Sequence, residues 1–175
     1  MFNNTLGGLS SEVVCMLDRA CANITIRYNE DEWHSKNDGR FGQIIQDLYV
    51  EPGGVHGRCE ADLKGCEIKT KNLASTSNDI NMADFNNPWN ADGVNMFHQT
   101  YNKIKDSLCF VDYVLSEPGV IIVKRITLYQ DLPLKKFKSY IRTRDMIRNM
   151  NFNVNKNKLK LMYKKTKIIF DDLVA

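Results

Sequence analysis

The sequence predicts a single α/β domain over residues 1–175, on three observations. Two segments of the first third carry apolar residues at helical spacing. Two later stretches, 108–115 and 120–128, are strongly β-prone and are joined by a turn at Ser116–Gly119. Hydrophobic residues make up 43% of the chain and charged residues 26%, which are ordinary globular values. A chain of 175 residues buries roughly 70% of its unfolded surface, enough for a core that needs no disulfides.

The first elements are two helices and a hairpin. Ser10 or Ser11 can cap the first helix, whose apolar face consists of Val13, Val14, Leu17 and Ala20 or Cys21. The second helix is expected from about Arg40 to Tyr49, with a break at Glu51–Gly54 after it and an apolar face of Phe41, Ile44, Ile45 and Leu48. A hairpin is expected over roughly 58–72, turning at Lys64–Gly65.

The second half begins with residues 73–92, which are rich in Asn, Ser and Asp and indicate a long ordered loop or lid. A helix near 94–107 should lead into the two strands. Pro133 suits the first turn of a further helix to about Met150. Residues 159–163 and 167–170 are expected to form a closing hairpin.

The charged residues of the first hairpin can share one face. With a two-residue turn at Lys64–Gly65, Leu63 lies opposite Cys66, Asp62 opposite Glu67, and Glu60 opposite Lys69. Directly opposed carboxylates, with Cβ atoms roughly 5 Å apart, repel each other unless a cation lies between them. A divalent metal would supply that charge. The alternative is an exposed polar hairpin in which Glu60 pairs with Lys69.

The charge is distributed unevenly along the chain. Of the 24 Lys and Arg residues, 12 lie between Lys135 and Lys167, with only Asp145 among them, whereas 18 of the 21 acidic residues precede Pro133. A basic C-terminal third, 133–175, beside an acidic centre favours an arm that binds a polyanion. A solvated basic surface explains the same pattern.

The cysteines and the N-terminus indicate the compartment. The five cysteines are odd in number and contain no Cys-x-x-Cys, so neither a disulfide framework nor a zinc ribbon is predicted. A reducing cytoplasm fits best. The N-terminus lacks the regions of a signal peptide, and no apolar run approaches the length of a membrane span, so we expect no membrane association.

Three motifs together resemble a known enzyme superfamily. They are Gly39–Gln46 on a helix, Asp62 followed by Glu67-Ile-Lys69-Thr, and the segment Tyr101–Val111, which carries Lys103 and leads into a hydrophobic strand. Their order and separation resemble the PD-(D/E)XK endonucleases, of the MutH type and of the PvuII restriction-endonuclease type. The resemblance covers about half the chain. It implies a restriction-endonuclease-like central mixed β-sheet flanked by helices.

The resemblance also implies roles for individual residues. Asp62 and Glu67 match the metal-binding carboxylates, with the Ile68 carbonyl as a further ligand, and Lys69 matches the catalytic lysine. Lys103 corresponds to the auxiliary lysine of the MutH-type pattern. Where that pattern has a helix Glu this chain has Gln46, as in the PvuII type, and Glu60 is one residue that could supply the missing carboxylate.

The function implied is hydrolysis of phosphodiester bonds in double-stranded DNA by a Mg²⁺-dependent, sequence-specific endonuclease that also tolerates Mn²⁺. Cutting both strands of a symmetric site would favour a homodimer. Expected DNA contacts are Lys71, Asn72, Lys158, Lys160, Lys164 and Lys165. Three alternatives stay open: a MutH-like nicking enzyme, a cap-snatching type of RNA endonuclease with His34 ahead of its acidic ligands, and a decayed nucleic-acid-binding module.

Overall fold

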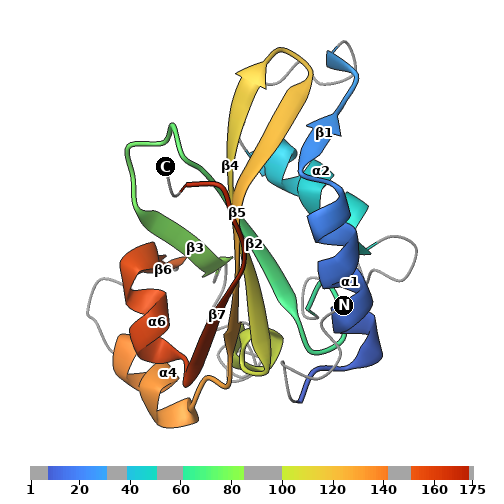
Figure 1. Ribbon diagram of the computed structural model, residues 1–175. Helices are drawn as coiled ribbons and strands as arrows, with labels where there is room; N and C mark the ends of the chain where they lie inside the picture. The colour runs from blue at the N-terminus through green and yellow to red at the C-terminus, as the bar shows by residue number, and fades with distance from the viewer. Residues whose placement is uncertain (1–7, 31–38, 51–60, 85–99, 142–150, 174–175) are drawn as a thin grey trace, which may run out of the picture.

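The computed structural model describes residues 8–30, 39–50, 61–84, 100–141 and 151–173. Within them the chain forms helices, a five-stranded sheet and a two-stranded sheet (Figure 1). The elements are, in order, α1 (Ser11–Ala22), β1 (Thr25–Arg27), α2 (Gly39–Val50), β2 (Glu67–Asn72), β3 (Asp79–Asp84), β4 (Ser107–Glu117), β5 (Val120–Gln130), α4 (Leu134–Ile141), β6 (Asn151–Asn155), the 3-10 helix η2 (Lys156–Lys158), α6 (Leu159–Met162) and β7 (Lys165–Asp171).

The five-stranded sheet is mixed. Its strands follow the order β1-β5-β4-β2, and β7 pairs with β5 beside β1. All pairings in it are antiparallel except that of β2 with β4, which is parallel and aligns Glu67 with Leu108. β2 therefore lies at an edge of the sheet, so one row of its backbone N–H and C=O groups is open to other partners.

Both faces of this sheet are covered. The first face packs against α1 and α2 through a core of apolar side chains from α1, α2, β2, β4 and β5. The second face packs against α4, α6 and the β3–β6 ribbon, with Phe110 of β4 and Phe137 of α4 in its core. In Figure 1 the two groups of elements lie on opposite sides of the sheet. The predicted mixed sheet flanked by helices is thus confirmed.

The two predicted N-terminal helices are also confirmed. Ser10 caps α1 and accepts a hydrogen bond from the N–H of Val13, as its position before an apolar periodic segment predicted. Arg19 of α1 donates to the backbone carbonyl of Tyr49 in α2, at 2.7 Å, so the two helices are joined by a hydrogen bond as well as by packing. The predicted strands 108–115 and 120–128 are β4 and β5, each longer than expected.

Other expectations were wrong. Residues 159–163 do not form a strand of a closing hairpin: Leu159–Met162 is a short helix, α6, and β7 pairs with β5. The stretch 73–92 is not all loop, because residues 79–84 form β3, which pairs with β6. The helix before β4 ends at Ile104 rather than Ser107. The strand β1 was not predicted.

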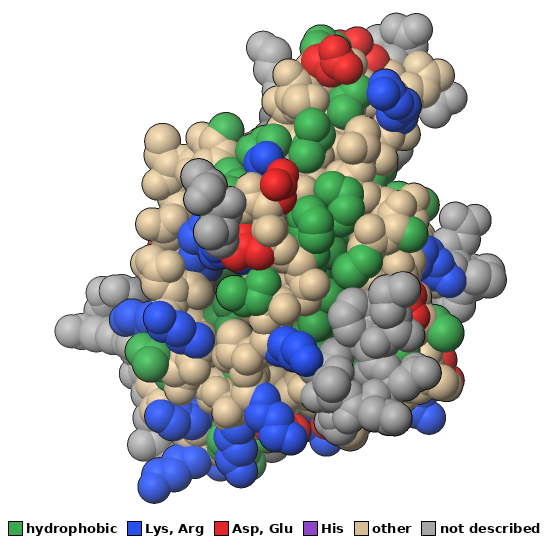
Figure 2. Space-filling view, in the orientation of Figure 1, with side chains coloured by type: hydrophobic (Ala, Val, Ile, Leu, Met, Phe, Trp, Pro, Cys, Tyr) green, Lys and Arg blue, Asp and Glu red, His purple; other side chains and the backbone are tan. Residues whose placement is uncertain are grey.

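Two observations concern the surface. In the described part of the chain, none of the helices combines the length and apolar composition needed to cross a membrane. Lys and Arg side chains gather on the face over α4 and α6 in Figure 2. The exposed lysines of α4, of residues 158–164 and of β7 form what we call the basic surface: Lys135, Lys136, Lys138, Lys158, Lys160, Lys164, Lys165 and Lys167.

Candidate functional site

The candidate site lies on the edge strand β2. Because side chains alternate along a strand, Cys66 and Ile68 point into the core beneath α1 and α2, whereas Glu67 and Lys69 point to the opposite face. The sequence analysis placed Glu67 and Lys69 on one face. The structure confirms this shared face, since Ile68 is fully buried between them in the helix-covered core.

The turn before β2 is the one the sequence predicted. Leu63 and Cys66 exchange two backbone hydrogen bonds, of 3.0 and 2.9 Å, around Lys64–Gly65. Gly65 has φ +80°, a left-handed conformation that glycine adopts without a Cβ penalty. In the described residues the hairpin pairing is limited to this one bridge. Beyond it the Asp62 side chain, not its backbone, bonds to the Ile68 N–H, so the predicted pairing of Asp62 opposite Glu67 does not continue the hairpin. The hydroxyl of buried Ser107 donates to the Gly65 carbonyl and ties the turn to the start of β4.

The open edge of β2 binds two side chains at the Ile68 peptide. The Asp62 carboxylate accepts a hydrogen bond from the Ile68 N–H at 2.8 Å, and the Gln46 side-chain amide donates to the Ile68 carbonyl at 3.1 Å. Both backbone groups of Ile68 are thereby paired with side chains, one from α2 and one from the segment before the turn. This arrangement brings together three predicted site residues, Gln46, Asp62 and Ile68.

Glu67 is the most unusual group of the site. It is only 3% exposed, and its pKa is raised to about 8, chiefly by burial and also by the hydrogen bond and the negative charge of Asp62. The positive charges of Lys69 and Lys103 oppose this rise in pKa. The Lys103 ammonium lies 3.4 Å from Glu67 Oε2. Four of the five predicted catalytic residues therefore meet here: Asp62, Glu67, Lys69 and Lys103.

The fifth, Gln46, reaches the site because α2 packs close to β2. A Cβ built on Gly42 would collide with the Thr70 hydroxyl, so this position of the helix admits no side chain without rearrangement of the strand residue. Gln46 lies one turn further along α2. The sequence signal was the Gly39-x-x-Gly42 spacing, which the resemblance named but which periodicity alone could not explain.

The donor atoms of the site suit a hard divalent cation. Carboxylates of Asp62 and Glu67 and the Ile68 carbonyl are all oxygen ligands, and Mg²⁺ is commonly bound through one or two carboxylates plus water. Glu67 Oε2 is buried and makes no hydrogen bond, but it lies 3.4 Å from the Lys103 ammonium, so a bound cation would share this oxygen with Lys103. The Ile68 carbonyl has a second lone pair besides the one that Gln46 occupies. Among the described residues there is no group of three or more His, Cys, Asp or Glu side chains that could hold a metal ion, so the carboxylates that these residues offer here are those of Asp62 and Glu67.

The predicted DNA-contact residues fall into two groups. Those on β2 make contacts within the chain: the Lys71 ammonium donates to the Asp79 carbonyl at 2.9 Å, and the Asn72 side chain accepts from the Ala74 N–H. The other four are exposed and belong to the basic surface, although the Lys165 ammonium lies 3.8 Å from Asp131: Lys158, Lys160, Lys164 and Lys165.

Among the candidate site residues, Glu60 and His34, which supported the cap-snatching alternative, lie outside the described residues. So do the predicted break at Glu51–Gly54 and the expected helical residues 94–99 and 142–150.

The structure adds one residue that sequence reasoning missed, Ser107, which holds the turn. It also gives a physical reason for Gly42, which the resemblance included: Gly42 lets α2 approach β2. A serine at the start of a strand has no distinguishing local pattern, so no sequence signal for Ser107 existed.

No protein-family model matches this chain, and no curated protein sequence matches it either. A solved structure does: the restriction endonuclease MvaI in complex with its cognate DNA substrate, at 12% identity and a TM-score of 0.59. The match covers 93% of this chain and 100% of that chain. At this level of identity the likeness concerns the fold. The chain therefore has a restriction-endonuclease-like fold.

Proposed function

We propose that this chain is a Mg²⁺-dependent endonuclease that hydrolyses phosphodiester bonds of double-stranded DNA. The observation that carries the proposal is the pair Asp62 and Glu67 beside Lys69 and Lys103, at the edge strand of a restriction-endonuclease-like sheet. The fold neighbour is a restriction endonuclease whose structure contains cognate DNA, which supports DNA as the substrate. The residues, rather than the fold, support the chemistry.

Asp62, Glu67 and the Ile68 carbonyl would hold the cation. When bound, Mg²⁺ supplies a Lewis acid for a phosphate oxygen and lowers the pKa of a coordinated water. Glu67 must lose its proton to serve as a ligand, and Lys69 and Lys103 favour its charged form. Asp62 is held in place by the Ile68 N–H, so one carboxylate is positioned before the cation arrives.

Lys69 and Lys103 act on the substrate. Lys69 shares a face with Glu67, and its ammonium would stabilise the negative charge that develops on the scissile phosphate. Lys103, at 3.4 Å from Glu67 Oε2, adds a second positive charge at the same centre. Gln46 carries no charge and cannot act as a base; its amide instead fixes the Ile68 carbonyl.

The basic surface would hold the DNA backbone beside this centre. Some of its lysines come from α4 and from residues 158–164, which pack on the face of the sheet that Glu67 and Lys69 share. The others come from β7, a strand of the same sheet. Phosphate contacts of this kind supply affinity without reading sequence. Cutting both strands would require two such chains, in keeping with a homodimer.

The test is incubation of supercoiled plasmid with Mg²⁺, with Mn²⁺ and with EDTA. We expect cleavage with either metal, none with EDTA, and none with Glu67→Gln. Glu117→Gln, at the exposed turn between β4 and β5, is the matched control and should cleave normally. Nicked circles alone would favour the MutH-like nicking alternative. Plasmid binding without cleavage in either metal would reject the enzyme and favour the decayed binding module.

A further inference from the structure

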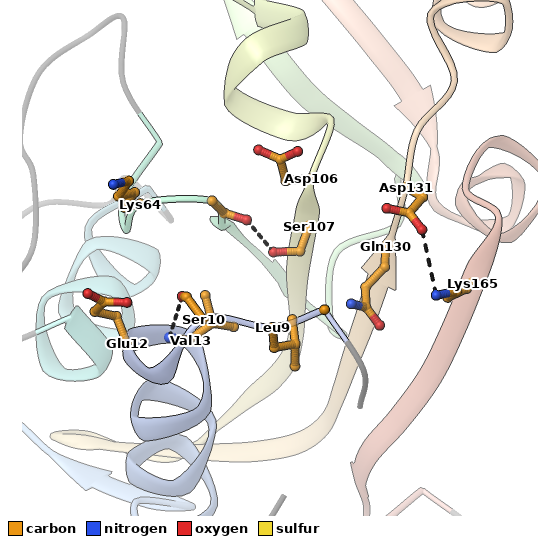
Figure 3. A pocket seen from close by; sticks show the side chains of 12 residues that line it. Leu9, Ser10, Glu12, Val13, Lys64, Asp106, Ser107, Gln130, Asp131 and Lys165 are labelled. Atoms are coloured by element: carbon orange, nitrogen blue, oxygen red, sulfur yellow. Dashed lines mark hydrogen bonds and ion pairs between the residues drawn. The ribbon is translucent and has the colours of Figure 1, made fainter. Parts of the chain in front are cut away.

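A cavity of about 390 Å³ lies at the end of the main sheet where β4 begins and β5 ends (Figure 3). Four parts of the chain surround it: the start of α1, the turn at Lys64–Gly65, the strand ends Ser107 and Gln130, and Lys165 of β7. The volume falls in the range of small-molecule sites, roughly 300–1,000 Å³. None of the predicted metal or catalytic residues lines it.

Gln130 is the central polar group of the cavity. It aligns with Ser107 on β4 and with Lys165 on β7, so these three neighbours lie in one row across the sheet. Gln130 as a residue is 8% exposed, and its amide makes no hydrogen bond to any described residue. In Figure 3 the amide points into the cavity. A primary amide presents a donor and an acceptor side by side, and the Gln130 amide is not among the fully enclosed polar groups of the described residues, so a molecule in the cavity can reach both atoms.

The remaining walls restrict the ligand further. Leu9 and Val13 provide an apolar side on which a flat ring can lie. At the rim three carboxylates, of Glu12, Asp106 and Asp131, stand against two ammonium groups, of Lys64 and Lys165. An anion inside the cavity is therefore disfavoured, whereas a group with N–H donors is favoured.

A planar ring that carries an amino group next to a ring acceptor meets these requirements. Glutamine pairs with adenine through two such hydrogen bonds. We propose that the cavity is a nucleobase-binding site, which takes the amino-bearing edge of adenine on the Gln130 amide. The base can come from a free nucleotide or from a DNA duplex, out of which one base is turned.

The position of the cavity suits the second source. Gly65 lines the cavity and precedes Glu67 by two residues, a span of at most roughly 7 Å along the chain. Asp106 follows Lys103 by three residues and lines the rim. A base in the cavity could thus belong to a nucleotide close to the scissile phosphate. This second source rests on the proposed function, but the binding of a base does not.

The first experiment titrates the protein with deoxyadenosine and with thymidine, monitored by NMR chemical shifts. We expect saturable binding of deoxyadenosine, at least tenfold tighter than thymidine, and loss of that preference in Gln130→Leu. Thr127→Val, a buried substitution on the same strand but away from the cavity, is the control and should bind normally. Leu9→Trp, which fills the cavity from its apolar wall, should also abolish binding if Gln130→Leu fails to fold.

The second experiment identifies the source of the base. Duplexes with 2-aminopurine directly beside each adenine of the mapped cleavage site are bound in Ca²⁺, so that every tested adenine keeps its 6-amino group. A fluorescence rise at one position, absent with Gln130→Leu, assigns the site to a base of the DNA; deoxyadenosine binding without any rise assigns it to a free nucleotide. Failure of deoxyadenosine to bind, or equal binding to Gln130→Leu, overturns the proposal. Deoxyadenosine binding by a chain that does not cleave plasmid would reject the nuclease and leave this site standing.

Discussion

Replacement of Asp62 by Asn removes one of two neighbouring negative charges while it keeps an oxygen that can accept the Ile68 N–H. Asp62 raises the pKa of Glu67, by a hydrogen bond and by its charge, so Asp62→Asn should lower that pKa from about 8. The metal-free variant should consequently be at least as stable as the unaltered chain. This gain in stability should be larger at high pH than at low pH.

The direction follows from proton binding in the two states. The unfolded chain releases the Glu67 proton near the ordinary pKa of 4.5, whereas the folded chain keeps it until about 8. Stability therefore falls as the pH rises between these two values, and it is level above the higher one. In Asp62→Asn this fall is smaller, because the folded pKa is lower. The stability of Asp62→Asn relative to that of the unaltered chain should therefore increase with pH.

The size of the gain can be worked out per unit of pKa. Each unit by which the substitution lowers the Glu67 pKa is worth about 1.4 kcal/mol above about pH 8. For a chain of this length that corresponds to roughly 3–5 °C in melting temperature. At about pH 5 little difference should remain, since Glu67 is then protonated in the folded state of both proteins.

The assay is thermal melting of the metal-free proteins at about pH 5, 7 and 9, with Asp62→Ala as the matched control. Alanine cannot accept the Ile68 N–H, so it should cost about 1–3 kcal/mol at every pH, offset in part by the lost repulsion at high pH. Equal destabilisation by Asn and Ala, or a difference from the unaltered chain that does not grow with pH, would refute the reasoning. Addition of Mg²⁺ should raise the melting temperature of the unaltered chain only.

Three further predictions concern Gln46, Gly42 and the basic surface. Gln46→Glu loses the donor to the Ile68 carbonyl, so the metal-free melting temperature should fall while Mg²⁺ affinity, measured calorimetrically, rises; unchanged affinity would count against the placement of Gln46. Gly42→Ala should lower the melting temperature, because its methyl group meets the Thr70 hydroxyl, and Gly42→Ala with Thr70→Ala should recover most of the loss. The third prediction concerns four exposed lysines of the basic surface: Lys158, Lys160, Lys164 and Lys165. Their neutralisation should lower the slope of log DNA affinity against log salt concentration by up to about 4 units. An unaltered slope would mean that this surface does not contact DNA.

The parts of the fold that sequence predicts well are those with a regular apolar pattern. The faces of α1 and α2 are periodic, and β4 and β5 are long, apolar and joined by a Pro-Gly turn. The β3–β6 ribbon has neither property. Its strands are rich in Asn and Asp, and they are separated in sequence by the whole of β4, β5 and α4, so only their pairing reveals them.

The prediction of a strand at 159–163 was wrong for a different reason. Its apolar residues Leu159, Leu161, Met162 and Tyr163 fit a short strand as well as one turn of helix, and a pattern this short cannot separate the two. Leu159 and Met162 are three residues apart, and both are buried in the core that contains α4 and Ile104. A helix places both side chains on this one face, whereas a strand would not.

The candidate site also has features that follow from local sequence and features that depend on distant packing. The turn and the alternation of β2 follow from local residues, so the placement of Glu67 and Lys69 on one face could be predicted from the sequence, whereas the roles expected of Asp62, Glu67 and Lys69 came from the resemblance. The pKa of Glu67 could not, because it results from burial by elements distant in sequence. The contact of Gln46 with the Ile68 carbonyl likewise depends on the packing of α2 against β2.

The most direct test of the nuclease assignment is single-turnover DNA cleavage by Lys69→Ala in Mg²⁺, measured together with DNA affinity in Ca²⁺. If Lys69 stabilises the transition state, the cleavage rate should fall by orders of magnitude while DNA affinity and the Mg²⁺-induced rise in melting temperature are largely retained. Near-normal cleavage by Lys69→Ala, in a protein that folds and binds DNA, would contradict the account.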